Sequence, residues 1–367
     1  MKWTAPVVLV LVWCAAPATA RVLHVSPNGG TEAPGTIEKP VRLDRAVLQA
    51  VAGDVIRLAA GNYQLSNGWL PLVFGKAGLV VEGGWDASYQ RRDPFGSPSV
   101  LLAPSEFDKP LVFIPPTPDS VVVDGLTLDG GPGGRYGSKG VAEGAYGRVF
   151  PLVRVERAGD VTLRNCTLLN SPGHAVAGSV RVKLTVDNAV MVNHRVSAVT
   201  AWGVQQDAAL IVRNSTILGV WAEKPGGERG EAVDIQRDVK VTLDGNILDD
   251  IQGACVRVGR GNPPPTLLGN AVGRCGAGVV RAWPQPGPPV DLPLMALEQE
   301  GVLDARLNTQ LARAVNPDTG AFAAHAAVKN VPDGGKPPTP AYAPRSAMTA
   351  VGLLGLDPRA GARFKAP

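Results

Sequence analysis

Short apolar segments with a polar ending recur along this chain. Each copy has two or three apolar positions, then usually a charged residue, and then Asn or Gly. The seven copies occupy 79–83, 121–125, 161–165, 184–188, 210–214, 241–245 and, shifted by one residue in register, 266–270. This self-similarity indicates stacked units, each of which buries its apolar face against the next.

A second strand is predicted in each unit between about 150 and 283. Its marker is a valine, usually after a small residue, at Val153, Val176, Val199, Val233, Val256 and Val279. Strand alternation points this valine inward and the residue after it outward. The predicted outward column is Arg154, Ala177, Thr200, Asp234, Arg257 and Val280. Two strands and three bends per coil indicate a triangular β-helix.

Equivalent residues of stacked coils lie ~4.8 Å apart, so columns can be read from the aligned repeats. Asn165, Asn188 and Asn214 share one column and predict an asparagine ladder at a bend. The preceding column is charged, at Glu82, Asp124, Arg164, Asp187, Arg213 and Asp244. Its sign alternates after the two acids, and we interpret it as a solvated charge ladder.

Both ends of the chain differ from the repeats. Residues 1–20 combine Lys2, the apolar run 7–13 and Ala18-Thr-Ala20, which is typical of a secretory signal peptide. We therefore predict a mature start at Arg21 and export to the periplasm, the cell surface or the medium. After it, Leu43, Val47 and Val51 have the spacing of a short amphipathic helix that would cap the first coil.

The predicted organisation is a signal peptide at 1–20, an all-β solenoid at 21–283 and an appendage at 284–367. Prolines between 284 and 289 interrupt the strand pattern. Helical spacing at 294–315 and five prolines within 331–345 predict an appendage that is partly helical and partly disordered.

Composition narrows the classes of protein. Aromatic residues make up 5% of the chain, whereas Gly and Pro number 44 and 33, which favours an all-β fold. The small, evenly spread net charge of +4 argues against a nucleic-acid partner, and no transmembrane segment is predicted in the mature chain.

Three cysteines remain after the predicted signal peptide. Cys255 and Cys275 fall on adjacent coils, which allows a disulfide, and we expect Cys166 to be a buried thiol.

The segments 22–63 and 83–94 resemble parts of secreted bacterial proteins of the pectin-lyase-like group. The resemblance implies a right-handed parallel β-helix that handles acidic polysaccharide along one outward strand face. The group's catalytic motifs are not intact here. Gly173-His174 precedes Asp249-Asp250, the reverse of their order in polygalacturonases, and the Asp-Pro-His-Asp motif of mannuronan epimerases has no match.

Polar and aromatic residues concentrate on the coils between 151 and 258, beside insertions at 130–148 and 221–229. We expect Arg154 and Arg257 to hold carboxylates, and Trp202 to stack on a sugar ring together with Tyr136 or Tyr146. For catalysis, the acid or base would be Glu231 or Asp234, with His174 as the alternative; these are the candidate catalytic residues.

Structural interpretations compete with these assignments. Asp234 and Arg257 are adjacent in one column, and a cross-strand ion pair on the surface explains both residues without any role in binding or catalysis. His174 and His194 suit turns or the surface, and Asp249-Asp250 suits a turn.

The sequence thus predicts an exported β-helix protein that binds polysaccharide or a surface partner along the solenoid. The alternative is a lyase, glycoside hydrolase or epimerase that acts on acidic glycans. No cofactor is predicted; Ca²⁺ is the one alternative, although the face carries few acids. The oligomeric state is left open.

Overall fold

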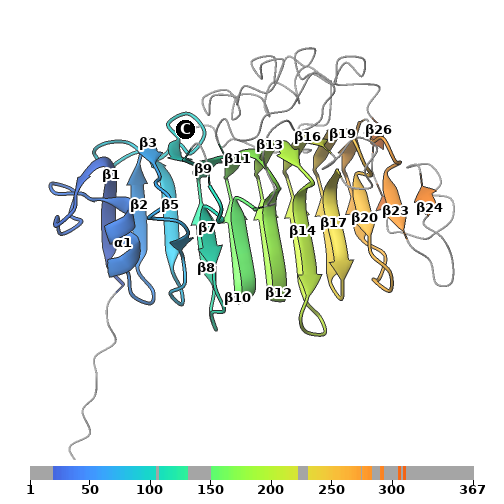
Figure 1. Ribbon diagram of the computed structural model, residues 1–367, viewed down its shortest axis with the longest axis horizontal. Helices are drawn as coiled ribbons and strands as arrows, with labels where there is room; N and C mark the ends of the chain where they lie inside the picture. The colour runs from blue at the N-terminus through green and yellow to red at the C-terminus, as the bar shows by residue number, and fades with distance from the viewer. Residues whose placement is uncertain are drawn as a thin grey trace, which may run out of the picture.

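A computed structural model describes residues 20–104, 107–130, 150–221, 230–273 and 275–282, with three short strands at 290–292, 305–306 and 309–310. The chain is a parallel β-helix whose coils stack along the long axis of the molecule (Figure 1). Parallel pairing links each strand to its equivalent on the next coil. The predicted fold class is therefore confirmed.

The larger sheet contains two rows of strands. The first row contains β4 (Leu72–Val73), β7 (Val112–Ile114), β10 (Val153–Arg164), β12 (His174–Asp187), β14 (Ser197–Gly203), β17 (Glu231–Arg237), β20 (Val256–Val258) and β23 (Val280–Ala282). The second row contains β1 (Val22–Gly30), β2 (Val55–Ala59), β5 (Val80–Trp85), β8 (Val121–Asp124), β15 (Ala209–Arg213), β18 (Lys240–Asp244), β21 (Thr266–Leu268) and β25 (Ala305–Arg306). The long strands β10 and β12 run through both rows and join them into one sheet.

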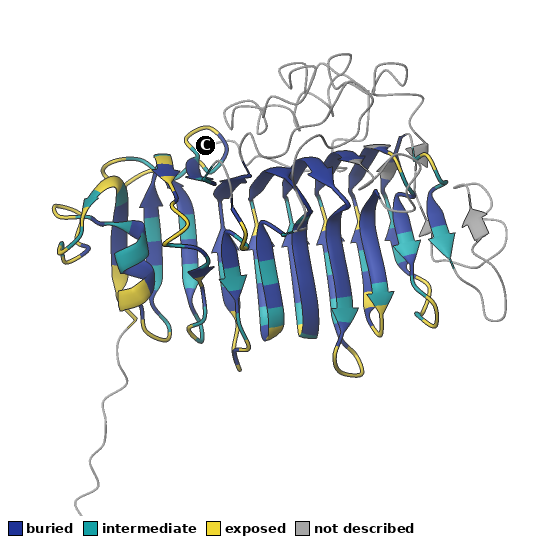
Figure 2. Cartoon of the chain, in the orientation of Figure 1, coloured by how far each residue is buried: buried dark blue, intermediate teal, exposed yellow. Residues whose placement is uncertain are grey.

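The third side of the coil is a separate parallel sheet. It contains β3 (Gly61–Gln64), β6 (Ser99–Leu102), β9 (Leu126–Asp129), β11 (Thr167–Ser171), β13 (Val190–Arg195), β16 (Thr216–Trp221), β19 (Ile247–Ile251), β22 (Ala271–Val272) and β26 (Thr309–Gln310). Figure 2 shows buried residues running along the strands, with exposed ones gathered at the turns and the helix. Val176, Val199 and Val233 are completely buried, as the alternation predicts.

Asparagines at the bends support the stacking. Asn165, Asn188 and Asn214 all have positive φ, and the Nδ2 of Asn188 donates to Oδ1 of Asn165 at 2.8 Å. The predicted ladder is therefore confirmed between Asn165 and Asn188, whereas the Nδ2 of Asn214 donates to Oδ1 of Asp187 at 3.1 Å. The sequence analysis missed a second ladder, in which the Nδ2 of Asn193 on β13 donates to Oδ1 of Asn170 on β11 at 2.8 Å. These amides satisfy one another while the backbone turns in a left-handed conformation that Asn tolerates.

The charged column is a ladder of ion pairs. Arg164 contacts Asp124 at 2.8 Å, and Arg213 contacts Asp187 at 2.8 Å. Both arginines are about half exposed, which agrees with the solvated-face interpretation. Asp124 departs from that interpretation, because its side chain is only 2% exposed and also pairs with Arg92.

The single helix of the described residues, α1 (Leu43–Gln49), packs near β1, β2 and β4. Leu43 and Val47 are buried as predicted, but Val51 lies beyond the helix end and is 47% exposed. Ala46 takes the third buried position instead, because an i, i+3, i+4 set faces one side of a helix more closely than i+8 does.

Strand pairing continues after residue 283. β24 (Val290–Leu292) pairs antiparallel with β23, whereas β25 and β26 extend the parallel sheets from β21 and β22. The sequence predicted helix over 294–315, and this is wrong at the four residues of β25 and β26. The open edges of β21 and β22 offer backbone partners that outweigh local helix propensity. The remainder of the predicted helix and the segment 331–345 lie outside the described residues.

Candidate functional site

The outward side chains of the first row form in-register columns. One column contains Arg154, Ala177, Thr200, Asp234 and Arg257, in the order that the sequence predicted. At its end the structure corrects the prediction by one residue. Val256 pairs with Val280, so Val280 is the buried member and Arg281 continues the outward column. The coil from Val256 to Val280 is one residue longer than the coil from Val233 to Val256, which accounts for this slip.

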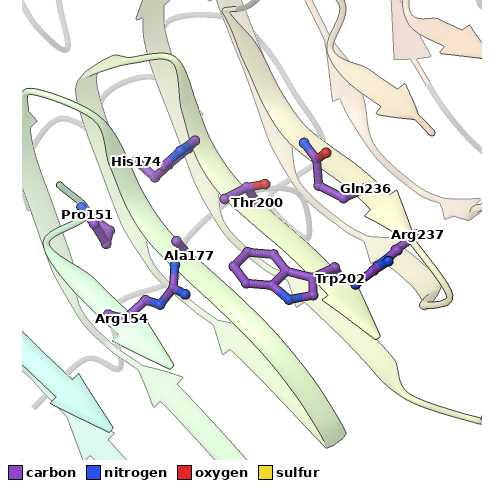
Figure 3. A pocket seen from close by; sticks show the side chains of 8 residues that line it. All are labelled: Pro151, Arg154, His174, Ala177, Thr200, Trp202, Gln236 and Arg237. Carbon is purple, nitrogen blue, oxygen red and sulfur yellow. The ribbon is translucent and has the colours of Figure 1, made fainter. Parts of the chain in front are cut away.

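A groove of about 450 Å³ lies on this face. Its lining residues are Pro151, Arg154, His174, Ala177, Thr200, Trp202, Gln236 and Arg237 (Figure 3). Pro151 precedes β10, and the other lining residues lie in β10, β12, β14 and β17. The groove therefore crosses adjacent coils. Among them, the ionisable side chains are Arg154, His174 and Arg237, and none is a carboxylate.

An arginine and a tryptophan form the floor of the groove. The guanidinium carbon of Arg154 lies 4.9 Å from the ring centre of Trp202. The two residues are separated by the coil of β12, where the small side chain of Ala177 leaves room for the contact (Figure 3). Cation–π attraction orients both groups while the arginine keeps N–H donors for an anion.

A bulge in β17 brings Arg237 into the groove. The register between β14 and β17 shifts after Ala201, so Trp202 stands opposite Arg237 rather than Gln236. Sequence reasoning placed Gln236 in that position and missed Arg237. A bulge leaves no clear signal in the repeat, because the one extra residue is absorbed within the strand.

His174 lies at one rim of the groove and is fixed by Ser197. Its Nδ1 is 2.6 Å from the Ser197 hydroxyl oxygen. The pairing register places the two residues side by side on β12 and β14. His174 is half-buried and lines the groove, whereas Ser197 is fully buried.

Glu231 is the next member of the same column. It stands opposite Ser197, is 0% exposed, and accepts a hydrogen bond from its neighbour's backbone, Gly230 N–H, at 3.1 Å through Oε2. Its Oε1 has no hydrogen-bond partner among the described residues. Burial, reinforced by the charge of Asp234, raises the pKa of Glu231 to about 7.

Asp234 is engaged by its neighbours. Arg257 Nη1 donates to Oδ1 at 2.7 Å, while Thr200 and Gln236 donate to Oδ2. The Asp234 side chain is 1% exposed, so the carboxylate of this ion pair is buried, whereas a pair on a surface column would be exposed. The competing ion-pair interpretation of Asp234 and Arg257 is thus what the geometry shows. Any role of these two residues in binding or proton transfer remains a proposal.

His194 is buried beneath the bend that precedes His174. The Ser171 backbone N–H donates to its Nδ1 at 3.4 Å, and burial lowers the pKa of His194 to about 3. The expectation of a turn or surface position is wrong for His194, because β13 continues through it and turns its ring into the molecule. The expected turn at Asp249-Asp250 is also wrong, because both residues lie within β19, where Asp249 is fully buried.

The other predicted aromatic contacts lie in insertions. Tyr136 and Tyr146 fall outside the described residues, as do most residues of both insertions. In the chain, one insertion lies between β9 and β10 and the other lies between β16 and β17.

The acids near the groove do not form a metal site. No group of three or more His, Cys, Asp or Glu side chains in the described part of the chain could hold a metal ion. Glu231 and Asp234 are the neighbouring carboxyl groups, and Asp234 already pairs with Arg257. Two such acids do not match the six to eight oxygen ligands of Ca²⁺.

A disulfide lies on the coils next to the site. Cys255 and Cys275 are bonded, with their Cα atoms 5.4 Å apart, and Cys166 is a buried free thiol. Both expectations for the cysteines are confirmed. No helix in the described ranges is long and apolar enough to cross a membrane.

The sequence matches no protein-family model and no curated protein. Similar solved structures include the pectate lyase Pel9A, with a TM-score of 0.39 and 12% identity over 71% of each chain. A rhamnogalacturonan lyase has a TM-score of 0.43 and 11% identity over 74% of this chain and 79% of that one. The PL6 family alginate lyase AlyGC has a TM-score of 0.47 and 16% identity over 80% of this chain and 40% of that one.

Proposed function

We propose that this protein binds an acidic polysaccharide, a polymer with carboxylates on its sugar rings, in the groove over β10, β12, β14 and β17. One observation carries the proposal. Every ionisable side chain among the described residues that line the groove, namely Arg154, His174 and Arg237, is basic, and an indole lies between the two arginines. Arginine pairs with carboxylates through two parallel hydrogen bonds, and a flat aromatic ring suits the apolar face of a sugar.

We propose a role for each residue from its position. Arg154 is oriented by Trp202 and would hold one carboxylate, and Arg237 would hold another on the far side of the indole. Arg257 already binds Asp234 and is not among the residues that line the groove, so we give it no direct contact with the ligand. Tyr136 or Tyr146 would add a second stacking surface from the insertion between β9 and β10.

The ligand would lie along the solenoid axis. Adjacent coils repeat at ~4.8 Å, and the lining residues come from successive coils. A polymer that runs along the axis meets a new set of side chains at each coil. A polymer that runs along a strand would leave Arg154 and Arg237 unable to act together.

Cleavage of the polymer is the second candidate function, and His174 favours it. Elimination beside a uronate carboxylate needs a cation on that carboxylate and a base near the adjacent carbon. Arg154 can supply the cation, and His174 lies in the same groove. Glu231 is an alternative base or acid, but it is fully buried and is not among the lining residues, so it would act on the ligand through its neighbours. Asp234 suits this role less well because both of its oxygens accept hydrogen bonds.

Export by the predicted signal peptide is part of the same proposal, since such polymers lie outside the cytoplasm. N-terminal sequencing of the native protein should give Arg21 as the first residue. Recovery of the intact precursor from the cytosol would contradict it.

A panel of acidic and neutral polysaccharides tests the function. We expect binding of polyuronates and no binding of neutral glucans at the same mass concentration. The products then distinguish the activities: new ultraviolet absorbance from an unsaturated uronate identifies a lyase, reducing ends without that absorbance identify a hydrolase, and a changed uronate composition identifies an epimerase. Binding without any product supports the non-catalytic function. Failure to retain any acidic polymer would overturn the proposal in favour of another surface partner.

A further inference from the structure

Three polar residues form a continuous column across three coils at the bend beside the groove. His174, Ser197 and Glu231 are paired in register from β12 to β14 to β17. The residues that follow them, Ala175, Ala198 and Ala232, are buried in the core. Ser197 and Glu231 are themselves fully buried, whereas His174 is half-buried. Side chains stacked in this way are ~4.8 Å apart, within reach of hydrogen bonds when one of them is as long as glutamate.

The first link of this column is formed in the structure. The Ser197 oxygen lies 2.6 Å from Nδ1 of His174. A hydroxyl can either donate to that nitrogen or accept from it. Which of the two occurs decides the tautomer of His174, and so decides whether Nε2 carries a proton.

The second link of the column would join Ser197 to Glu231. Glu231 is fully buried against Ser197, and its Oε1 lacks a hydrogen-bond partner among the described residues. A buried carboxyl oxygen in that state is costly, and the hydroxyl of Ser197, its in-register neighbour on β14, is a group that can satisfy it.

We propose that His174, Ser197 and Glu231 form a proton relay, in which the protonation state of Glu231 selects the tautomer of His174 through the Ser197 hydroxyl. With Glu231 ionised, Ser197 donates to the carboxylate and accepts from Nδ1–H, which leaves Nε2 as a base. With Glu231 protonated, its hydroxyl donates to Ser197, Ser197 donates to Nδ1, and Nε2 carries the proton as an acid.

The relay conserves protons. When a ligand in the groove gives a proton to Nε2, the proton on Nδ1 passes to the Ser197 oxygen, and the hydroxyl proton of Ser197 passes to Glu231. The ligand has then lost one proton and the column has gained one. The reverse sequence returns the proton to a leaving oxygen. In this scheme Ser197 is a positioning residue, and the use of the relay in cleavage rests on the proposed function.

Other charged groups surround the column and affect the pH at which Glu231 and His174 change protonation state. Asp234 on β17 opposes ionisation of Glu231, Arg257 on β20 favours it, and His194 on β13 interacts electrostatically with His174. Arg154 and Arg237 face His174 across the groove. Buried Arg195 on β13 and buried Asp249 on β19 lie on strands that adjoin the bend.

Nitrogen-15 NMR of histidine-labelled protein tests the relay without any polysaccharide, so it is independent of the proposed function. The His174 signals can be assigned by their loss in His174→Gln. In the wild type we expect His174 to move from the Nε2–H to the Nδ1–H tautomer as Glu231 loses its proton near neutral pH. Glu231→Gln and Ser197→Ala should each abolish this movement.

Ser197→Thr keeps the hydroxyl and should retain the tautomer change, which separates the relay from a general loss of structure. A His174 tautomer that stays constant through this range in the wild type would overturn the proposal. So would an unchanged tautomer response in a folded Ser197→Ala protein.

Discussion

Arg154 and Trp202 touch across an intervening coil, with the guanidinium carbon 4.9 Å from the indole centre. The contact passes over Ala177, so a small residue on β12 permits a basic and an aromatic side chain to share one floor. It holds in place a cation that no carboxylate of the groove lining neutralises. A ladder with only a structural role has no need of this arrangement.

Removal of either partner should weaken binding of a polyuronate. We expect Trp202→Ala and Arg154→Ala each to reduce affinity by about 10-fold, since cation–π and stacking contacts contribute ~1–2 kcal/mol. Calorimetric titration measures this directly. Arg213→Ala is the matched control, because Arg213 is an exposed arginine of the second row that pairs with Asp187. Equal losses in the control and the groove variants would show a non-specific charge effect.

The Asp234–Arg257 pair should contribute to stability more than a surface pair. Removing the carboxylate in Asp234→Ala leaves Arg257 without its partner at 2.7 Å, and we expect a loss of about 1–3 kcal/mol because Arg257 is partly exposed. Urea unfolding provides the measurement. Asp234→Ala combined with Arg257→Leu should recover part of the loss. A neutral single variant that loses polysaccharide binding would instead favour a direct role for Asp234.

Glu231 should make the folded state less stable as pH rises. Its pKa of about 7 in the folded protein lies above the ~4.3 of an exposed glutamate, so the folded state holds the proton more tightly. The stabilising contribution is present below about pH 4 and is lost as pH rises through 7, by up to ~3 kcal/mol. The unfolding free energy of Glu231→Gln minus that of the wild type should therefore increase from pH 5 to pH 8.

The effect of Glu231 has to be measured as a difference between Glu231→Gln and the wild type, because His194 also makes the unfolding free energy depend on pH. Burial lowers the pKa of His194 to about 3, below the ~6.5 of free histidine, so its contribution is present above pH 6.5 and is lost as pH falls toward 3. The two effects have opposite slopes between about pH 4.5 and 6.5. Asp207→Asn, at an exposed site, is the control and should follow the wild type. A pH-independent difference for Glu231→Gln would contradict the raised pKa.

The Cys255–Cys275 bridge closes a loop with a sequence separation of 20 and should stabilise the last coils by about 3 kcal/mol. Unfolding with and without a reductant measures this. Cys166 is buried, and burial raises the pKa of its thiol to about 12, so it should react with thiol reagents only after unfolding. Denatured mature protein should show one thiol before reduction and three afterwards. Three thiols without reduction would exclude the bridge.

The solenoid could be predicted from the sequence because its coils stack in register. Once Val153, Val176 and Val199 were aligned, the outward neighbours Arg154, Ala177 and Thr200 followed by strand alternation. The cysteine pair followed for the same reason.

Bends and bulges limited the prediction of the site. The bulge that brings Arg237 opposite Trp202 adds one residue within a strand, which no periodicity reports. The column of His174, Ser197 and Glu231 could have been found, since all three residues stand at the same distance before the repeated valine. Their orientation could not, because alternation breaks at a bend. The second asparagine ladder had a visible signal in Asn170 and Asn193, which recur 23 residues apart.

Titration of a polyuronate and of the same polymer with its carboxylates reduced to alcohols tests the central claim most directly. The two ligands share a backbone and differ only in charge. Wild-type protein and Arg213→Ala should bind the polyuronate and not the reduced polymer, and binding should weaken with added salt. The Arg154→Ala, Arg237→Ala double variant should lose the preference while remaining folded. Equal binding of both polymers by the wild type, or an undiminished preference in the double variant, would contradict an acidic-polysaccharide site in this groove.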